Sequence, residues 1–374
     1  MLNLGRCRLE AAPSATLSTR AVDLVLGTTV VDMLGLLTLD WSRLARWHAA
    51  PEEFVEPDYR RLERTGITVF HPAVETNAAD AHQGALRWAA SWRRLLDAGG
   101  CFLAPIESVV DLLSVRARGR LGVLIGFQNS NHFRDLADVE LFHALGQRVS
   151  QLTYNRRNRL GSGCYVARDR GLTEFGAAVV GEMNRLGMAV DVSHCGERTS
   201  LDVLAASRRP VLVTHANCAA LVPRQPRCKS DAVLRALAAN GGVLGVTLVR
   251  AYVGGGAPTL DDLLDHFDHV ARLAGVDHVG LGSDLDADGL DPGTGRLRAA
   301  YLIHGLDPGV RAFQLAEGLL GRGYGERDVE AMLGGNFLRA LAANWPLDAA
   351  APEPWARRDP FCPAPRRLAP ATGV

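Results

Sequence analysis

One alternation runs through the chain from about residue 21 to residue 345. Short apolar runs rich in β-branched residues are followed by polar or glycine-bearing loops, and then by longer segments with helical periodicity. Eight runs have the strand pattern, and they cover residues 28–34, 66–72, 123–128, 148–154, 188–194, 210–215, 243–248 and 278–284. Strands joined through helices pair in parallel, and eight parallel strands close into a ring. The pattern therefore predicts an α/β fold, a (β/α)8 TIM barrel.

This pattern divides the 374 residues into three parts. Residues 1–20 form an N-terminal segment without the alternation, and residues 21–345 form the barrel domain. Residues 346–374 are rich in proline and alanine, and proline interrupts a helix because it lacks the backbone N–H and clashes with the preceding turn. We expect this last segment to be an arm that lies on the barrel or on a partner subunit.

The composition favours a globular protein of the cytoplasm. The 41 Lys+Arg balance the 41 Asp+Glu, and 47% of the residues are hydrophobic, which excludes a disordered chain and argues against nucleic-acid binding. No apolar run reaches the about 20 residues that cross a bilayer, and the N-terminus lacks the apolar region of a signal peptide. Seven cysteines are too few for a disulfide framework, as expected in a reducing compartment. We expect no membrane and no nucleic-acid partner.

Polar side chains gather at the carboxyl ends of the predicted strands, the face where barrel enzymes keep their active sites. They are Gln128, Tyr154, His194, His215 and Asp284. His194 and His215 end consecutive strands about 4.8 Å apart, so their imidazoles can grip one metal ion. Asp284 ends the last strand, where it can accept a proton from a water. A lone histidine in such a place is more often a core residue, but several polar residues at one rim favour a functional site.

Five segments carry sequence motifs that follow one another in a defined order along the chain. They are residues 145–164 (LGQRVSQLTYNRRNRLGSGC), 171–194 (GLTEFGAAVVGEMNRLGMAVDVSH), 208–217 (RRPVLVTHAN), 239–247 (ANGGVLGVT) and 277–286 (DHVGLGSDLD). In this order they resemble the membrane (renal) dipeptidase family, a branch of the amidohydrolase superfamily of metal-dependent barrels. The resemblance implies a barrel of the metal-dependent hydrolase type, a small carboxylate-bearing substrate and a homodimer.

The resemblance also implies roles for single residues. His194 and His215 match two histidines of the family's second zinc site, and Asp284 matches the acid that orients or deprotonates the water. Arg227 matches an arginine that holds the substrate's carboxylate. The predicted catalytic residues are Asp284, Tyr154, His194 and His215. The predicted ligands of a single metal site are His194, His215 and Asp284, and the predicted substrate-binding residues are Arg227, Gln128, Asn155 and Cys164.

Several positions depart from the family pattern. Leu34 and Leu36 stand where the first strand should carry a His-x-Asp metal pair, and Gln128 replaces the Glu that bridges two zinc ions. Tyr154 replaces a substrate-polarising histidine, and Cys228 replaces an asparagine. Leucine cannot ligate a metal, and an amide oxygen is a poor zinc donor beside a carboxylate. The same changes resemble a divergent bacterial branch, and they predict a degraded centre that holds one weakly bound zinc or other divalent ion, or none.

Three functions are compatible with this pattern. The first is a dipeptidase-like hydrolase that cleaves a dipeptide or an N-acyl amino acid with a water activated by a single ion, while Tyr154 donates to the oxyanion. The second is a metal-independent isomerase, lyase or thiol-dependent transferase on a small modified amino acid, with Cys164, Cys195 or Cys228 as the thiol. The third is a binding homologue without catalysis. Because a scaffold has no use for a water-activating Asp284, the sequence favours the hydrolase.

Overall fold

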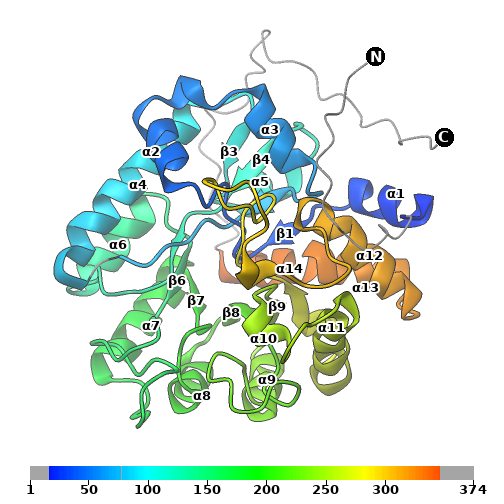
Figure 1. The fold of residues 1–374 in the computed structure, drawn as a ribbon. Coiled ribbons are helices and arrows are strands. Elements are labelled where there is room, and N and C mark those ends of the chain that lie inside the picture. Colours follow the sequence, from blue (N-terminus) through cyan, green and yellow to red (C-terminus); the bar gives the residue numbers. More distant parts are fainter. Residues whose placement is uncertain (1–16, 77, 346–374) are drawn as a thin grey trace.

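The centre of the molecule is a ring of parallel strands (Figure 1). The computed structural model describes residues 17–76 and 78–345. Neighbouring strands pair in the order β3-β4-β2-β1-β10-β9-β8-β7-β6-β5. Only Leu124 and Ile125 separate β4 from β5, so these two pieces of one chain segment close the ring. The strands are β1 (Val31–Asp32), β2 (Val69–Phe70), β3 (Leu103–Pro105), β4 (Leu121–Val123), β5 (Gly126–Phe127), β6 (Val149–Gln151), β7 (Ala189–Asp191), β8 (Leu212–Ala216), β9 (Val243–Val246) and β10 (Val279–Leu281).

The ring confirms the predicted barrel and all eight predicted strands, with β4 and β5 together forming the third of them. The paired stretches are two to five residues long, shorter than the predicted runs, because those runs also include the polar residues that follow each strand. The sequence analysis did not predict β3. It holds three residues and ends in Pro105, and it pairs in parallel with β4.

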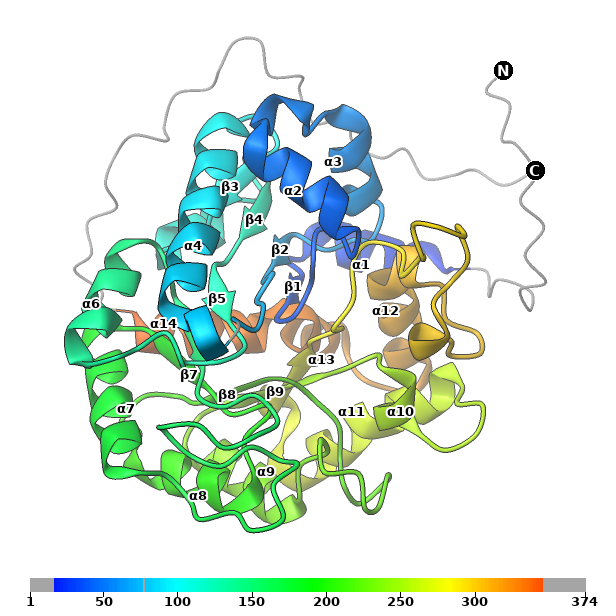
Figure 2. The same ribbon diagram turned by 60° about the vertical axis from the view of Figure 1, so that its left-hand side comes forward.

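Helices surround the ring on its outside (Figures 1 and 2). They are α1 (Thr19–Gly27), α2 (Trp41–Ala49), α3 (Glu56–Glu63), α4 (Ala81–Ala98), α5 (Val109–Ser114), α6 (Leu136–Ala144), α7 (Glu174–Leu186), α8 (Glu197–Ala206), α9 (Asp231–Ala239), α10 (Arg250–Val253), α11 (Leu260–Ala274), α12 (Arg311–Gly321), α13 (Glu326–Glu330) and α14 (Asn336–Asn344). The apolar faces of these helices and the outward side chains of the strands form one large buried cluster.

The amino ends of the strands are closed by α14. Its side chains Phe337 and Leu341, together with Trp345, share a second buried cluster with Val31 and Val243, which begin β1 and β9. Burial of large apolar side chains is worth about 1.5–3 kcal/mol each, so this contact holds the helix firmly against the ring. The open end of the barrel is therefore the carboxyl end of the strands.

Between α13 and α14 the helix widens into a π-helical turn, Ala331–Gly335. A Cβ atom on Gly334 would clash with the backbone oxygen of Thr29, just before β1. Glycine at this position therefore lets the turn approach the first strand more closely than any other residue would.

The described elements begin with α1 at Thr19 and end with α14 at Asn344. The predicted arm, residues 346–374, and most of the predicted N-terminal segment lie outside the described residues. Among residues 17–76 and 78–345, no helix is both long enough and apolar enough to cross a membrane.

Candidate active site

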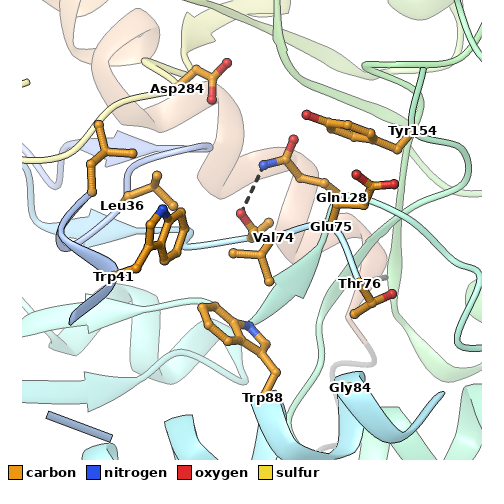
Figure 3. Close-up of a pocket in the computed structure, with 12 residues that line it drawn as sticks. Leu36, Trp41, Val74, Glu75, Thr76, Gly84, Trp88, Gln128, Tyr154 and Asp284 are labelled. Carbon is orange, nitrogen blue, oxygen red and sulfur yellow. Dashed lines mark hydrogen bonds between the residues drawn. The ribbon is translucent and has the colours of Figure 1, made fainter. Parts of the chain in front are cut away.

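A pocket of about 510 Å³ opens at the carboxyl ends of the strands (Figure 3). Three of the polar residues predicted at this rim line it: Gln128 after β5, Tyr154 after β6 and Asp284 after β10. The segments after β1 and β2 and the helix α4 form the rest of the wall, with Leu36, Leu39, Trp41, Ala73, Val74, Glu75, Thr76, Gly84 and Trp88. The structure thus brings side chains from distant parts of the chain to one cavity.

Asp284 has an unusual backbone and an unusual proton affinity. Its φ of 60° lies in the left-handed region, which costs a residue with a Cβ about 1 kcal/mol or more. The conformation is held by a hydrogen bond of 2.9 Å from its backbone N–H to the oxygen of Leu34. Burial raises the pKa of the Asp284 carboxyl to about 7, against the opposing charge of Arg227. A carboxyl with this pKa can take up and release a proton near neutral pH.

A buried ion pair holds the residue before Asp284. The backbone N–H of Ser283 donates to Asp32 Oδ1 at 2.8 Å, and the Ser283 hydroxyl donates to Asp32 Oδ2. The Arg311 guanidinium, from the start of α12, donates to the same Oδ2 at 3.2 Å. Both side chains of this pair are fully buried. The sequence analysis missed this support because its members are scattered over β1, the segment after β10 and α12.

His194 and His215 meet at the mouth of the barrel. Their Nε2 atoms are 2.9 Å apart. Nδ1 of His194 lies 2.8 Å from Oδ1 of Asn155, which can only accept, so His194 carries its hydrogen on Nδ1. His194 therefore turns the lone pair of Nε2 towards His215. The sequence analysis predicted this meeting of two imidazoles.

The other side of His215 contacts a hydroxyl and a carboxylate. Oγ1 of Thr214 lies 2.8 Å from His215 Nδ1 and 2.7 Å from Oδ2 of Asp191. Because the Thr214 hydroxyl donates to Asp191, His215 carries its hydrogen on Nδ1 and donates it to Thr214 Oγ1. The Nε2 lone pairs of the two histidines therefore face each other. Burial, followed by the charge of Arg227, lowers the pKa of both histidines, which favours the neutral form of each ring.

Tyr154 packs flat against this pair. Its ring stacks on His194 with centroids 4.3 Å apart and planes inclined by 24°. Burial and the nearby Asp284 carboxylate raise the pKa of the Tyr154 phenol. The hydroxyl therefore stays protonated and can donate a hydrogen bond to negative charge that develops in the pocket.

Gln128 presents an acceptor to the pocket. Its Nε2 donates to the backbone oxygen of Ala73 at 3.0 Å, as Figure 3 shows. This bond fixes the amide so that Oε1 remains as the acceptor for a ligand. Asn155, which has a φ of 55°, directs its Oδ1 towards Nδ1 of His194.

Arg227 lies below the mouth and is almost fully buried. Its two Nη atoms donate to the backbone oxygens of Ser193 at 2.6 Å and His215 at 2.7 Å, and its Nε has no hydrogen-bond partner among the described residues. The guanidinium thus fixes the ends of β7 and β8. Its predicted contact with a substrate carboxylate stays a prediction.

Lys229 is a functional candidate that the sequence analysis left unassigned. It is fully enclosed, and its Nζ donates to the backbone oxygens of Val192 at 2.7 Å and Cys195 at 2.8 Å. Burial lowers the pKa of this amine. The sequence feature that could have identified it is that Lys229 is the single lysine among the 41 Lys+Arg of the chain.

The predicted thiols do not have the environment of nucleophiles. Burial raises the pKa of Cys195 and of Cys228 to about 11, and it also raises the pKa of Cys164. The Cys164 thiol donates to Oδ1 of Asn155 at 3.7 Å, beside His194. Because the thiolate is the reactive form, these surroundings give no support to a thiol-dependent reaction.

The donor set does not fit the metal centre that the fold implies. Leu34 is fully buried, and Leu36 presents only hydrocarbon to the pocket. Among the described residues, no group of three or more His, Cys, Asp or Glu side chains could hold an ion. A catalytic zinc takes three protein ligands and a water, whereas the structure offers two imidazoles. A role for Asp284 as third ligand stays a prediction.

Comparison with known proteins places the barrel and its mouth in a known family. The model of the membrane dipeptidase family (Peptidase family M19) matches residues 28–350. The chain belongs to this family. The match covers the whole ring of strands and confirms the resemblance seen in the motifs.

Individual relatives resemble the chain over stretches of different length. Dipeptidase verJ of Clonostachys rogersoniana is 35% identical over 229 residues, which is 60% of this chain and 55% of that protein. Dipeptidase aclJ of Aspergillus oryzae is 34% identical over 248 residues, which is 64% of this chain and 56% of that protein. The chain thus spans just over half the length of these curated relatives. The crystal structure of an amidohydrolase from Pseudomonas aeruginosa is 29% identical, with a TM-score of 0.72 over 87% of this chain and 99% of that one.

Proposed function

We propose that this protein hydrolyses the amide bond of a small substrate, a dipeptide or an N-acyl amino acid. The observation that carries the proposal is the Asp284 carboxyl, whose pKa of about 7 makes it a base at neutral pH. Membership of the membrane dipeptidase family supports the reaction type, and the pocket of about 510 Å³ suits a molecule of this size.

Two residues of the pocket, Asp284 and Tyr154, can carry out different steps of the reaction. Asp284 takes a proton from a water as the water oxygen attacks the amide carbon. Tyr154 keeps its proton and donates a hydrogen bond to the carbonyl oxygen, where negative charge develops. When the C–N bond breaks, the proton on Asp284 passes to the leaving nitrogen. The proton that Asp284 takes from the water thus ends on the released amine, and both side chains return to their starting states.

The His194–His215 pair contacts the reacting groups through Tyr154, whose ring stacks on His194. The stacked ring of His194 fixes the plane of the phenol, and Asn155 fixes His194. We propose that the pair holds at most one divalent ion, because two imidazoles are the donors it offers. None of the steps above passes through that ion.

Arg227 supplies positive charge next to the same residues. Its charge opposes the rise of the Asp284 and Tyr154 pKa values, so it lies within electrostatic reach of both. We propose that it attracts the carboxylate of the substrate and thereby orients the amide over Asp284.

A direct assay tests the hydrolase. The purified protein is incubated at neutral pH with a panel of dipeptides and N-acyl amino acids, with and without added zinc or manganese, and the release of free amino acid is measured. We expect release by the wild type and a loss of at least about a hundredfold in Asp284→Asn. A folded wild type that releases nothing from any member of the panel under either condition would contradict the proposal.

A further inference from the structure

The pocket beside Asp284 is acidic and aromatic. Its charged lining residues are Glu75 and Asp284, and none of the described residues that line it carries a positive charge. We propose that Trp41, Trp88 and Glu75 form a subsite for a positively charged nitrogen of the substrate, an alkylammonium group. As a specificity pocket the subsite rests on the proposed hydrolysis, but its binding can be measured without turnover.

No cationic side chain among the described residues lines the pocket beside Glu75. Arg227 acts on Asp284 and Tyr154 from outside the lining, and its two Nη atoms donate to backbone oxygens. The Glu75 carboxylate meets the Asn129 amide at 3.5 Å, a weak contact that leaves most of its acceptor capacity open. Partial loss of solvent at the pocket wall raises the pKa of the Glu75 carboxyl, and a cation beside it would reverse that rise and stabilise the ionised form.

The aromatic walls fit the same kind of ligand. Trp41, the first residue of α2, is 53% exposed although it borders the pocket. Trp88 projects from α4, and Figure 3 shows the two indoles on one side of a space that Glu75 and Tyr154 border on the other. An indole face attracts a cation more strongly than any other side-chain ring does. An exposed tryptophan at the rim of an acidic pocket therefore favours a ligand with a positive charge.

The remaining polar groups are acceptors as well. Gln128 uses its Nε2 on Ala73, so Oε1 faces a ligand as an acceptor. Asp284 and Glu75 add carboxylate oxygens. The side of the pocket that Trp41, Trp88 and Glu75 border therefore complements a group that donates hydrogen bonds and carries positive charge. With the amide over Asp284, the cation would lie on the side of the β1 and β2 loops.

Ligand-observed NMR on the full chain tests the subsite. Choline is the cationic probe, and 3,3-dimethylbutan-1-ol is its uncharged isostere; each gives one methyl singlet. We expect choline to bind roughly tenfold more tightly than the alcohol, with its N-methyl signal moved upfield by the indole rings. Ethanolamine is a second cationic probe, and it carries a primary ammonium group. Binding of ethanolamine at least as tight as that of choline assigns the attraction to the carboxylates, whereas a preference for choline assigns it to the indoles, and either result supports a cation subsite.

Two variants and one control locate the binding. Glu75→Gln should weaken choline binding roughly fivefold and leave the alcohol unchanged, and Trp41→Ala should reduce the upfield shift. Both positions are exposed, so these variants should fold. Glu174→Gln removes an exposed carboxylate on α7 and should change nothing. Equal binding of choline and the alcohol, or unchanged choline binding in Glu75→Gln, would overturn the subsite even if the protein hydrolyses amides. Choline binding without any hydrolysis would instead remove the proposed function and keep the subsite.

Discussion

Nε2 of His194 and Nε2 of His215 lie 2.9 Å apart, and the Nδ1 atom of each ring has its own polar partner. Imidazoles that bind a metal are usually oriented in this way, through a hydrogen bond on the other ring nitrogen. The segment after β1 carries Leu34, which is buried, and Leu36, which lines the pocket. The structure therefore brings two imidazoles together and presents hydrocarbon from this segment to the pocket.

The first prediction concerns metal content. Protein purified without chelator should contain no more than one equivalent of zinc, manganese or iron, and His215→Ala should contain none, because one imidazole cannot retain an ion alone. Elemental analysis by mass spectrometry measures both, with Glu174→Gln as a folded control. Two equivalents in the wild type would show that ligands outside the donor set described here exist.

The second prediction concerns the rate and its pH dependence. Asp284→Asn should lower kcat by about 10²–10⁴, the usual scale for loss of a general base. In the wild type kcat/KM should rise with pH and level off above about 7, because the Asp284 carboxyl must be ionised and its pKa is about 7. A profile that is flat between pH 5 and 8 would show that another group is the base.

The third prediction concerns stability. The pKa of Asp284 is raised from 3.8 to about 7 in the folded chain, so between these values the folded state keeps a proton that the unfolded state has released. The free energy of unfolding should therefore fall as the pH rises through this window. Asp284→Asn has no such group, and its Tm should exceed that of the wild type at pH 8 but approach it near pH 4. Differential scanning calorimetry measures the difference, and a Tm below that of the wild type at pH 8 would contradict the burial of this carboxyl.

The fourth prediction restores the missing ligands. The triple change Leu34→His, Leu36→Asp and Gln128→Glu should raise metal stoichiometry towards two, because it supplies two first-strand donors and a carboxylate. Elemental analysis of folded protein is the measurement, and Leu34→Met with Leu36→Met is the apolar control. A well-folded triple variant without extra metal would show that these positions do not correspond to the family's first site.

The fifth prediction concerns the pair Asp32–Arg311. Arg311→Met should destabilise the fold by about 3–5 kcal/mol, because it leaves the fully buried Asp32 carboxylate without its cation. Adding Asp32→Asn should recover part of the loss, since the double variant has no unpaired charge. Urea unfolding of the single and double variants gives the coupling, and strictly additive losses would refute it.

The barrel was predictable because its information is local. β-Branched runs such as residues 243–248 and 278–284 favour a strand from their own composition. The alternation of strands and helices then predicts parallel pairing. Parallel strands also end on one face, so Gln128, Tyr154 and Asp284 were expected at a common rim, where the structure places them. The sequence analysis did not predict β3, because three residues that end in Pro105 are too few to show the hydrophobic pattern of a strand.

The interior of the site was not predictable in the same way. Asp32 and Arg311 are 279 residues apart, and nothing near either residue signals a partner. Trp41 and Trp88 lie in helical segments, where an aromatic residue normally indicates packing against the core, and only the path of the β1 and β2 loops turns them towards the pocket. Likewise, the partners of the Lys229 amine, the backbone oxygens of Val192 and Cys195, lie more than thirty residues earlier in the chain.

The buried ion pair between Asp32 of β1 and Arg311 of α12 has a consequence for biosynthesis. The carboxylate that steadies Ser283, and through it Asp284, precedes its guanidinium partner by 279 residues of chain. A growing chain that has not reached α12 therefore lacks the cation that neutralises this buried carboxylate. The support beneath Asp284 is completed only after α12 has been synthesised.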